Sequence, residues 1–432
     1  MRVIKPDQAG SGQKQLKTFL SALEKRASLS DSKGDVQAVV DKILRDVRRR
    51  GDNAVKKYTE KFSSTKVKSL SIGKREIDAS AKKVEKTFVK ALNLSARRIR
   101  MFHELQREES WYFSEKKGIL LGQLIRPIER VGVYVPGGKA SYPSTVLMNV
   151  IPAQVAGVKE IALCVPTTGK VDPHVAAAIK LLGLREIYRI GGAQAIAAMA
   201  YGTKTIKKVD KIVGPGNIYV ATAKKMVYGE VGIDMFAGPS EILIIADNSA
   251  HPSFIAADLL SQAEHDEVAS SVLITNSASL AKAVSSELSL QLKELKRKAI
   301  AKKSLETYGA IIITKSLNTA VDIANRIGPE HLEIMTRVPA RFLTKIKNAG
   351  AIFMGEWTPE TIGDYAAGPN HTLPTCGTSR FSSPLGVYDF LKRSSLINMK
   401  QEGFMSLAQS VENFADIEGL EAHGNSVRVR RQ

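Results

Sequence analysis

The 432-residue sequence predicts an α/β protein with two doubly wound units, preceded by a helical segment and followed by a small C-terminal segment. From about residue 130, short runs rich in β-branched residues alternate with Ala-rich helical stretches, which is typical of parallel strands joined by helical crossovers. The alternation starts again near residue 241, which indicates a second unit. Ligands of such sheets usually bind at the carboxyl ends of the strands, so we expect sites there and a cleft between the units.

Residues 1–130 are expected to be mostly helical, with a long amphipathic stretch at 74–105. They carry most of the net charge of +20, with 31 Lys and Arg against 16 Asp and Glu, whereas the remaining residues have 32 against 27. The charges interleave with apolar residues at helical spacing, as on solvated helix faces. Neither aromatic residues placed to stack on bases nor a recognisable nucleic-acid module accompanies them. We therefore do not expect nucleic-acid binding as the main function.

Residues 131–236 are expected to form the first α/β unit. Its strand-like runs are EIALCVP (160–166), EIYRIGG (186–192) and KIVGPG (211–216), and its helical runs are 173–183, 193–202 and 217–229. No G-x-G-x-x-G follows a strand, so the usual dinucleotide fingerprint is absent. Glycines instead gather at strand ends, in VPGG (135–138), IGGAQ (190–194), GPGN (214–217) and AGPSE (237–241). Each can be an ordinary turn, but four along one sheet edge favour a nucleotide or anion site.

Residues 237–380 are expected to form the second unit, and residues 381–432 a C-terminal segment with a final polar helix. The strands of the second unit are expected at 241–247, 271–277, 310–316, 331–336 and 351–356. A loop rich in Gly, Pro and Thr follows the last of them. Loops of this kind on a rigid scaffold commonly carry function.

Four polar stretches contain four of the seven histidines. They are LLSQAEHDEVA (259–269) with Gln262 and His265, IGPEHLEIM (327–335) with Glu330 and His331, TIGDYAAGPNHTLPT (361–375) with Asp364 and His371, and the tail from residue 417 with Glu418 and His423. Taken alone, the first is a polar helix face or half of a metal site, and the second is a solvated strand edge or a catalytic pair. His103, His174 and His251 are expected to be structural or solvated.

The two cysteines, Cys164 and Cys376, are too few for a disulfide framework or a cysteine-built metal site. Cys164 is expected in the core, and Cys376 has no adjacent base that would make it a nucleophile. No apolar run approaches the length of a membrane span, and the N-terminus lacks the apolar core of a signal peptide. These features favour a reducing cytoplasm as the location.

Eight short motifs, in this order and spacing, resemble histidinol dehydrogenases. They are VGVYVPGG, IGGAQAIAA, GPGN, AGPSE, SQAEHD, GPEH, GDYAAGPNHTLPT and EGLEAHGNSV, and the match extends from about residue 30 to residue 430. The resemblance implies two Rossmann-like domains without the glycine fingerprint, plus small helical parts, in an intertwined homodimer with shared active sites. It also implies zinc-dependent, NAD-linked oxidation of L-histidinol through L-histidinal to L-histidine, the last step of histidine biosynthesis.

The resemblance also assigns roles to individual residues. It implies that zinc is bound by Gln262, His265 and Asp364. The fourth implied ligand is His423, which reaches in from the partner subunit. The implied substrate contacts are these metal-site residues together with Ser240, His331 and Glu418. The implied NAD contacts are Tyr134, Gln194 and Asn217, and the implied catalytic pair is Glu330 and His331.

The catalytic pair suits an oxidation from alcohol to acid. Each of the two hydride transfers requires removal of an O–H proton, for which histidine is suited, and the aldehyde between them must be hydrated by an activated water. We therefore expect His331 to move protons in both oxidations and Glu330 to activate the water. Zinc could polarise the alcohol oxygen or only orient the substrate. The alternatives are a related dehydrogenase of another amino or hydroxy alcohol, and a basic nucleic-acid-binding protein that kept an enzyme fold.

Overall fold

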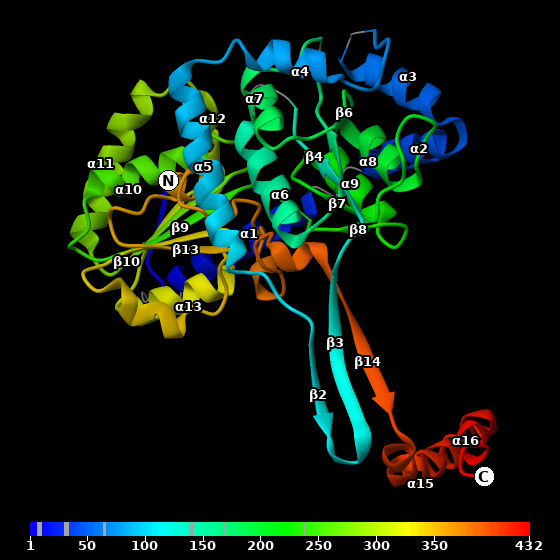
Figure 1. Cartoon of the computed structure of the whole chain (residues 1–432). Coiled ribbons are helices and arrows are strands. Elements are labelled where there is room, and N and C mark those ends of the chain that lie inside the picture. Colours follow the sequence, from blue (N-terminus) through cyan, green and yellow to red (C-terminus); the bar gives the residue numbers. More distant parts are fainter. Residues whose placement is uncertain (7–10, 30–33, 64–65, 138–141, 168, 237) are drawn as a thin grey trace.

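The computed structural model describes residues 1–432 apart from 7–10, 30–33, 64–65, 138–141, 168 and 237. Its described residues form a six-stranded sheet, a five-stranded sheet and a three-stranded sheet. The two larger sheets are parallel throughout, and the small one is antiparallel. Figure 1 shows the parallel sheets and their helices as one body, from which the small sheet projects as an arm.

The five-stranded sheet belongs to the first α/β unit and has the order β6-β5-β4-β7-β8. Its strands are β4 (Arg130–Tyr134), β5 (Glu160–Cys164), β6 (Glu186–Tyr188), β7 (Lys211–Val213) and β8 (Gly232–Ile233). Helices α6 (Pro143–Ala156) and α7 (Pro173–Leu181) contribute to the core on one face, and α8 (Gly192–Tyr201) and α9 (Ile218–Val227) to the core on the other. Because helices cover both faces of this sheet, its central strands appear in the sequence as continuous apolar runs.

The six-stranded sheet of the second unit repeats this strand order, with one strand added at its edge. Its order is β1-β11-β10-β9-β12-β13. The strands are β9 (Glu241–Ala246), β10 (Ser270–Thr275), β11 (Ala310–Ile313), β12 (His331–Met335), β13 (Ala351–Met354) and the added β1 (Arg2–Ile4). The helices on one face are α10 (Pro252–Ala263), α11 (Ala278–Glu294) and α12 (Lys298–Thr307), and those on the other are α1 (Ser11–Leu29) and α13 (Leu317–Ile327). The two units are therefore both doubly wound.

The N-terminal helices extend the cores of both units. Helix α1 packs on the second unit, and the other four cover the first: α2 (Gly34–Arg50), α3 (Asp52–Ser63), α4 (Lys74–Ala81) and α5 (Lys86–Glu104). The amphipathic stretch 74–105 thus forms two helices, because the backbone is extended at Glu85 before α5 begins. The break lets Ile77 of α4 and Leu92 of α5 enter the same core.

The arm consists of β2 (Trp111–Glu115), β3 (Ile119–Pro127) and β14 (Leu391–Met399), with β3 in the middle. Helices α15 (Gln401–Ile417) and α16 (Glu421–Arg428) lie at its far end (Figure 1). Many large apolar side chains of the arm and these helices are exposed, including Trp111, Tyr112, Ile397, Phe414 and Ile417. Among the helices that the structure describes, none has the length and apolar character needed to cross a membrane.

Candidate active site

The three residues expected to contact NAD lie around one cavity of about 920 Å³ in the first unit. Tyr134 ends β4, Gln194 lies in the first turn of α8, and Asn217 is the N-cap of α9. The cavity is therefore at the carboxyl ends of the strands, as the sequence predicted for a doubly wound sheet. The N-termini of α8 and α9 also adjoin it, and helix N-termini favour bound anions such as a pyrophosphate.

Hydrogen bonds fix two of these residues and leave the third free to bind. The Tyr134 hydroxyl accepts the Gly192 N–H at 3.1 Å, and Asn217 Oδ1 accepts the N–H groups of Tyr219 and Val220 at 3.1 and 3.2 Å. Gln194 is 2% exposed, and its Oε1 has no hydrogen-bond partner among the described residues. A buried amide oxygen without a partner is uncommon in folded proteins and suits a ligand donor.

The second group of predicted residues gathers around the start of β12. His331 is 4% exposed, and its Nδ1 lies 2.9 Å from the Glu241 carbonyl oxygen. Because that oxygen can only accept, Nδ1 carries the proton and Nε2 keeps its lone pair. Nε2 has no hydrogen-bond partner in the described part of the chain. Glu330 Oε2 accepts the Glu241 N–H at 2.9 Å and lies 3.7 Å from His331 Nδ1, so the two side chains of the pair adjoin each other.

This site lies at the amino edge of its sheet, which corrects the expectation of carboxyl-edge sites in the second unit. His331 begins β12, where it is in register with Ile242 near the start of β9 and with Ala351 at the start of β13. The general rule for doubly wound sheets therefore holds for the cavity of the first unit and fails for the catalytic pair. Glu330 and His331 are placed by the turn that leads into the strand rather than by a loop that leaves it.

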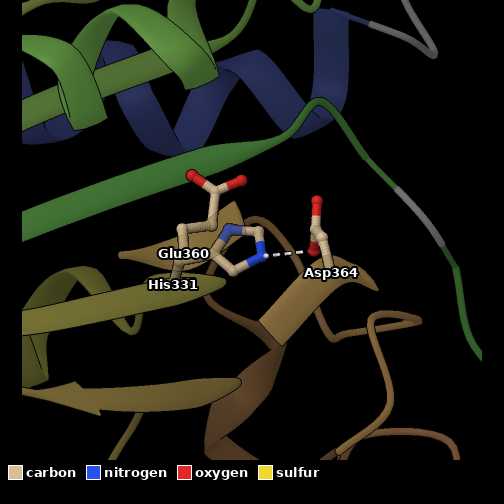
Figure 2. A group of neighbouring side chains, drawn as sticks. All are labelled: His331, Glu360 and Asp364. Atoms are coloured by element: carbon tan, nitrogen blue, oxygen red, sulfur yellow. Dashed lines mark ion pairs between the residues drawn. The ribbon is translucent and has the colours of Figure 1, made fainter. Parts of the chain in front are cut away.

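One cluster of described side chains brings together three groups that could bind a metal. The ligand atoms of His331, Glu360 and Asp364 lie within 4.8 Å of one another. Figure 2 shows His331 Nε2 turned toward Asp364 Oδ1, which is 4.0 Å away. Glu360 and Asp364 are one turn apart in the short helix α14 (Glu360–Tyr365). Glu360, which is 1% exposed, was not among the residues predicted from the sequence, although its i,i+4 spacing to Asp364 was a usable signal.

Burial shifts the protonation of this cluster strongly. It raises the pKa of Asp364 to about 7 and, with the charges of neighbouring carboxylates, raises those of Glu330 and Glu360 well above their usual range. Burial lowers the pKa of His331 to about 4, and the charges of His265 and His371 act in the same direction. His331 is therefore neutral near pH 7, and its Nε2 can accept a proton. Several buried carboxyls held together in this way would be ionised by a nearby cation.

Gln262 and His265 lie at the end of α10, close to this cluster. Gln262 is fully buried, and neither its Oε1 nor its Nε2 has a hydrogen-bond partner among the residues described. His265 follows in the turn after the helix and is exposed. It is not within 4.8 Å of the three clustered side chains, but its charge acts on the pKa of His331 and of His371. The site thus has an unsatisfied buried amide and a solvent-facing imidazole at its edge.

Ser240 and His371 complete the surroundings of the catalytic pair. Ser240 is half-buried immediately before β9, and its carbonyl oxygen accepts the Ser270 N–H at 3.0 Å. His371 Nδ1 donates to the Asp364 carbonyl oxygen at 3.1 Å. The loop that carries His371 is fixed to the first unit, because Asn370 Nδ2 donates to the Met148 carbonyl oxygen at 2.6 Å.

The comparisons with known proteins agree on one family. The family model described as histidinol dehydrogenase matches residues 25–431. Histidinol dehydrogenases of Geobacter metallireducens and Aquifex aeolicus are 54% and 51% identical over 400 and 414 residues, which cover 92% and 95% of this chain and 92% and 96% of theirs. The chain belongs to the histidinol dehydrogenase family. The crystal structure of the Elizabethkingia anophelis histidinol dehydrogenase has a TM-score of 0.89 at 38% identity, covering 91% of this chain and 92% of that one.

Histidinol dehydrogenases catalyse the final two-step oxidation of histidinol to histidine in histidine biosynthesis, and this chain is such an oxidoreductase. Membership also accounts for the fold of two Rossmann-like units that lack the glycine fingerprint.

Two residues assigned to the site of this histidinol dehydrogenase are not brought to it within one chain. Glu418 caps the C-terminal end of α15, and His423 lies in α16, and both are exposed. These helices stand at the end of the arm, far from α10, β12 and β13 in the same chain (Figure 1). One chain by itself therefore leaves the site around His331 without the two tail residues.

Proposed function

We propose that this histidinol dehydrogenase oxidises L-histidinol with NAD in the cavity of the first unit and holds one zinc ion beside the catalytic pair. The observation that carries the proposal is the buried His331, whose Nε2 is unprotonated and unpartnered next to Asp364. A base in this state is what the removal of a hydroxyl proton requires.

The residues present fit a zinc ion. Histidine and carboxylate side chains are the usual oxygen and nitrogen ligands of zinc, and an amide oxygen is a rarer one. Asp364 and His265 supply the usual types, and the buried amide of Gln262, with both polar atoms unsatisfied, needs a ligand partner. We propose these three as ligands, with the tail residue His423 of a second chain as the fourth. When bound, the ion would supply a fixed positive charge that orients the substrate beside the buried carboxyls.

His331 serves both oxidations in this scheme. NAD, when bound in the cavity, would take up the hydride of each oxidation. In the first, Nε2 of His331 accepts the hydroxyl proton as the hydride leaves the alcohol carbon, which yields the aldehyde. Water then adds to the aldehyde carbon while the proton on Nε2 passes to the aldehyde oxygen, which gives the hydrate and leaves Nε2 unprotonated again. In the second oxidation, Nε2 accepts an O–H proton of the hydrate as the hydride leaves its carbon, which yields the acid. The hydrogen bond from Nδ1 to the Glu241 carbonyl oxygen keeps the imidazole in the tautomer that this task needs.

Glu330 is assigned to the hydration step. Its carboxyl adjoins the imidazole, with Oε2 3.7 Å from His331 Nδ1, and it is buried where bulk water does not compete. As a carboxylate it would take a proton from the attacking water as the water adds to the aldehyde.

We further propose that two chains form a homodimer in which each tail completes the partner's site. Three features support this: the remoteness of α16 from its own site, the exposed apolar side chains of the arm, and the exposed Ile362 and Tyr365 on either side of Asp364. A surface of this kind is typical of an interface between copies. We place the reaction in the cytoplasm, in keeping with the free thiols of Cys164 and Cys376.

The test of the proposed function is NADH formation from L-histidinol by the purified protein. We expect two NADH for each histidinol consumed, loss of activity after treatment with a chelator, and recovery with zinc. Elemental analysis should find about one zinc per chain. His265→Ala should lose most of it, whereas His251→Ala, on an exposed histidine at the start of α10, should keep it.

Two results would contradict the proposal. A metal-free preparation with full activity would remove zinc from the mechanism. A larger kcat/KM for another amino or hydroxy alcohol, measured beside L-histidinol in the same panel, would assign the chain to a different substrate.

A further inference from the structure

The largest fully buried side chain of the described protein is a cation, Arg26, at the end of α1. Its guanidinium forms an ion pair with the Glu241 carboxylate and donates to the Val268 carbonyl oxygen at 3.0 Å. It also lies over the ring of Tyr308, 5.6 Å from the ring centroid. Taking a charge out of water costs several kcal/mol unless it is paired. An arginine at this depth therefore needs a role that an apolar side chain could not fill.

Its partner, Glu241, contacts both members of the proposed catalytic pair. Glu241 Oε2 accepts the backbone N–H groups of Glu330 at 3.3 Å and Cys376 at 3.2 Å. The Glu241 N–H donates to Glu330 Oε2 at 2.9 Å, and the Glu241 carbonyl oxygen accepts from His331 Nδ1 at 2.9 Å. Side chain and backbone of Glu241 thus hold Glu330 at two points and His331 at one.

We infer that Arg26 and Glu241 are positioning residues for this histidinol dehydrogenase: the buried guanidinium pairs with the Glu241 carboxylate and holds it in place, and Glu241 fixes the catalytic pair. The inference rests on the proposed roles of Glu330 and His331. It assigns to the N-terminal helix, which lies outside both α/β units in sequence, a part in the chemistry at the start of β12.

The negative charges of Glu241 and Glu330 explain why the buried partner of Glu241 is a cation. Glu241 and Glu330 are both buried carboxyls, and each accepts the backbone N–H of the other residue. Two negative charges held this close repel each other, so a neighbouring cation is needed for both to be ionised. Burial, with the charges of Glu241 and Asp364, raises the pKa of Glu330, and the charge of Arg26 opposes that rise. Without Arg26, a protonated Glu241 would accept the backbone N–H groups of Glu330 and Cys376 less well. The turn that positions Glu330 and His331 at the start of β12 would then be held less firmly.

The test compares Arg26→Met with Leu16→Ala. This control opens a cavity in the core beside the same helix and leaves the Arg26–Glu241 ion pair in place. Arg26→Met should lower kcat for histidinol and for histidinal by roughly ten- to a hundredfold, as expected when catalytic groups are misplaced by a fraction of an ångström. KM for both substrates, KM for NAD and the zinc content should stay near those of the wild type. Leu16→Ala should lower the melting temperature and leave kcat per folded molecule unchanged.

A rescue distinguishes positioning from general destabilisation. In Arg26→Met/Glu241→Gln both members of the buried ion pair are replaced by neutral side chains, and the Gln oxygen can still accept from the Glu330 N–H. This double variant should recover part of the kcat that Arg26→Met loses. If Arg26→Met does not fold, Arg26→Lys carries the same test, because it keeps the charge but not the planar fork, and it should lower kcat with KM unchanged.

The inference is overturned if folded Arg26→Met or Arg26→Lys keeps a kcat within twofold of the wild type. It is also overturned if Leu16→Ala, at an equal loss of melting temperature, loses as much kcat as Arg26→Met. His331→Ala is measured alongside to separate this failure from failure of the proposed function. An inactive His331→Ala with an active Arg26→Met refutes only the role of Arg26. An active His331→Ala refutes the catalytic pair itself and, with it, the inference.

Discussion

The two ring nitrogens of His331 have different surroundings, which suit the separate tasks proposed for them. Nδ1 donates to a backbone carbonyl oxygen that belongs to the neighbouring strand, and Nε2 faces Asp364 without a partner in the described structure. A backbone oxygen on a central strand is among the least mobile acceptors in a protein, so the orientation of the ring is fixed before substrate binds. The neighbouring Glu330 is held by the same strand, which keeps the distance between the two residues short.

Separate variants of the pair should show different kinetic defects. His331→Ala should lower kcat for both histidinol and histidinal by about 10² to 10⁴, because each oxidation needs the base. Glu330→Gln should slow mainly the aldehyde step, where water is activated, so that histidinal accumulates when histidinol is the substrate. Rapid-quench product analysis with each substrate measures both effects. If the two variants slowed the alcohol step equally and left the aldehyde step unchanged, the division of roles would be wrong.

His103 offers a pH test away from the proposed metal site. It is fully buried, its Nδ1 lies 2.7 Å from the Ile99 carbonyl oxygen, and burial lowers its pKa below the usual 6.5. The folded protein therefore binds fewer protons at this residue than the unfolded chain, and its contribution to stability is present above pH 6.5 and is lost as the pH falls below that value.

We expect His103→Gln to reduce the dependence of the unfolding free energy on pH between pH 7 and pH 5.5, because the variant lacks an imidazole that binds its proton more readily after unfolding. The buried His331 and His371, whose pKa values are also lowered, remain in both proteins, so the difference reports His103 alone. Urea denaturation at the two pH values measures it. Parallel pH profiles for variant and wild type would show that His103 does not contribute.

At the level of residues, the sequence predicted side chains that lie in recognisable motifs and missed those that act from a distance. Gln262 and Asp364 stand in short polar stretches that contrast with their apolar surroundings. Arg26 is 215 residues from Glu241 and lies in a helix whose charges otherwise face solvent, so no local pattern distinguishes it. Which of many lysines and arginines is buried is decided by tertiary packing, and one sequence does not contain that information.

Among secondary-structure elements, the buried parallel strands were the most predictable. Strands β9 and β10 are buried along their whole length and contain the apolar runs ILIIA and VLI, so their positions follow from the sequence. Strand β1 has three residues, and β2 is exposed along its whole length, so neither shows a periodic burial pattern. The place of Glu330 and His331 was predictable as well, because the strand expected at 331–336 begins at His331, although the general rule for such sheets favours the carboxyl edge.

The N-caps of two helices give a matched test of the NAD cavity. Asn217 caps α9 at the cavity, and Ser277 caps α11 in the second unit, where its Oγ accepts the Leu280 N–H at 3.2 Å. Each change to Ala should cost about 1 kcal/mol of stability through the lost cap. Only Asn217→Ala should also raise KM for NAD, by about fivefold for one lost hydrogen bond. An equal KM in both variants would place NAD elsewhere.

The whole molecule has a shape that one chain does not explain. A three-stranded arm with an exposed β2 and a pair of terminal helices projects from a compact body (Figure 1), and its apolar side chains face solvent. A small sheet of this kind needs an apolar face that is covered to be stable in water. In the proposed dimer, a second copy of the chain would cover the exposed apolar side chains of the arm. The sequence placed Glu418 and His423 in a terminal segment, but only the fold shows how far that segment extends from its own catalytic pair.

We propose that each active site combines the body of one chain with the tail of another. Co-expression of two inactive variants tests this shared site. His331→Ala removes the catalytic base from the body, and His423→Ala removes the proposed zinc ligand from the tail. In a mixed dimer, one site receives both lesions and the other joins an intact body to an intact tail. With random pairing, roughly a quarter of the wild-type activity should return. Activity that stays at background in verified mixed dimers would contradict the claim, because a site built within one chain would always keep one lesion.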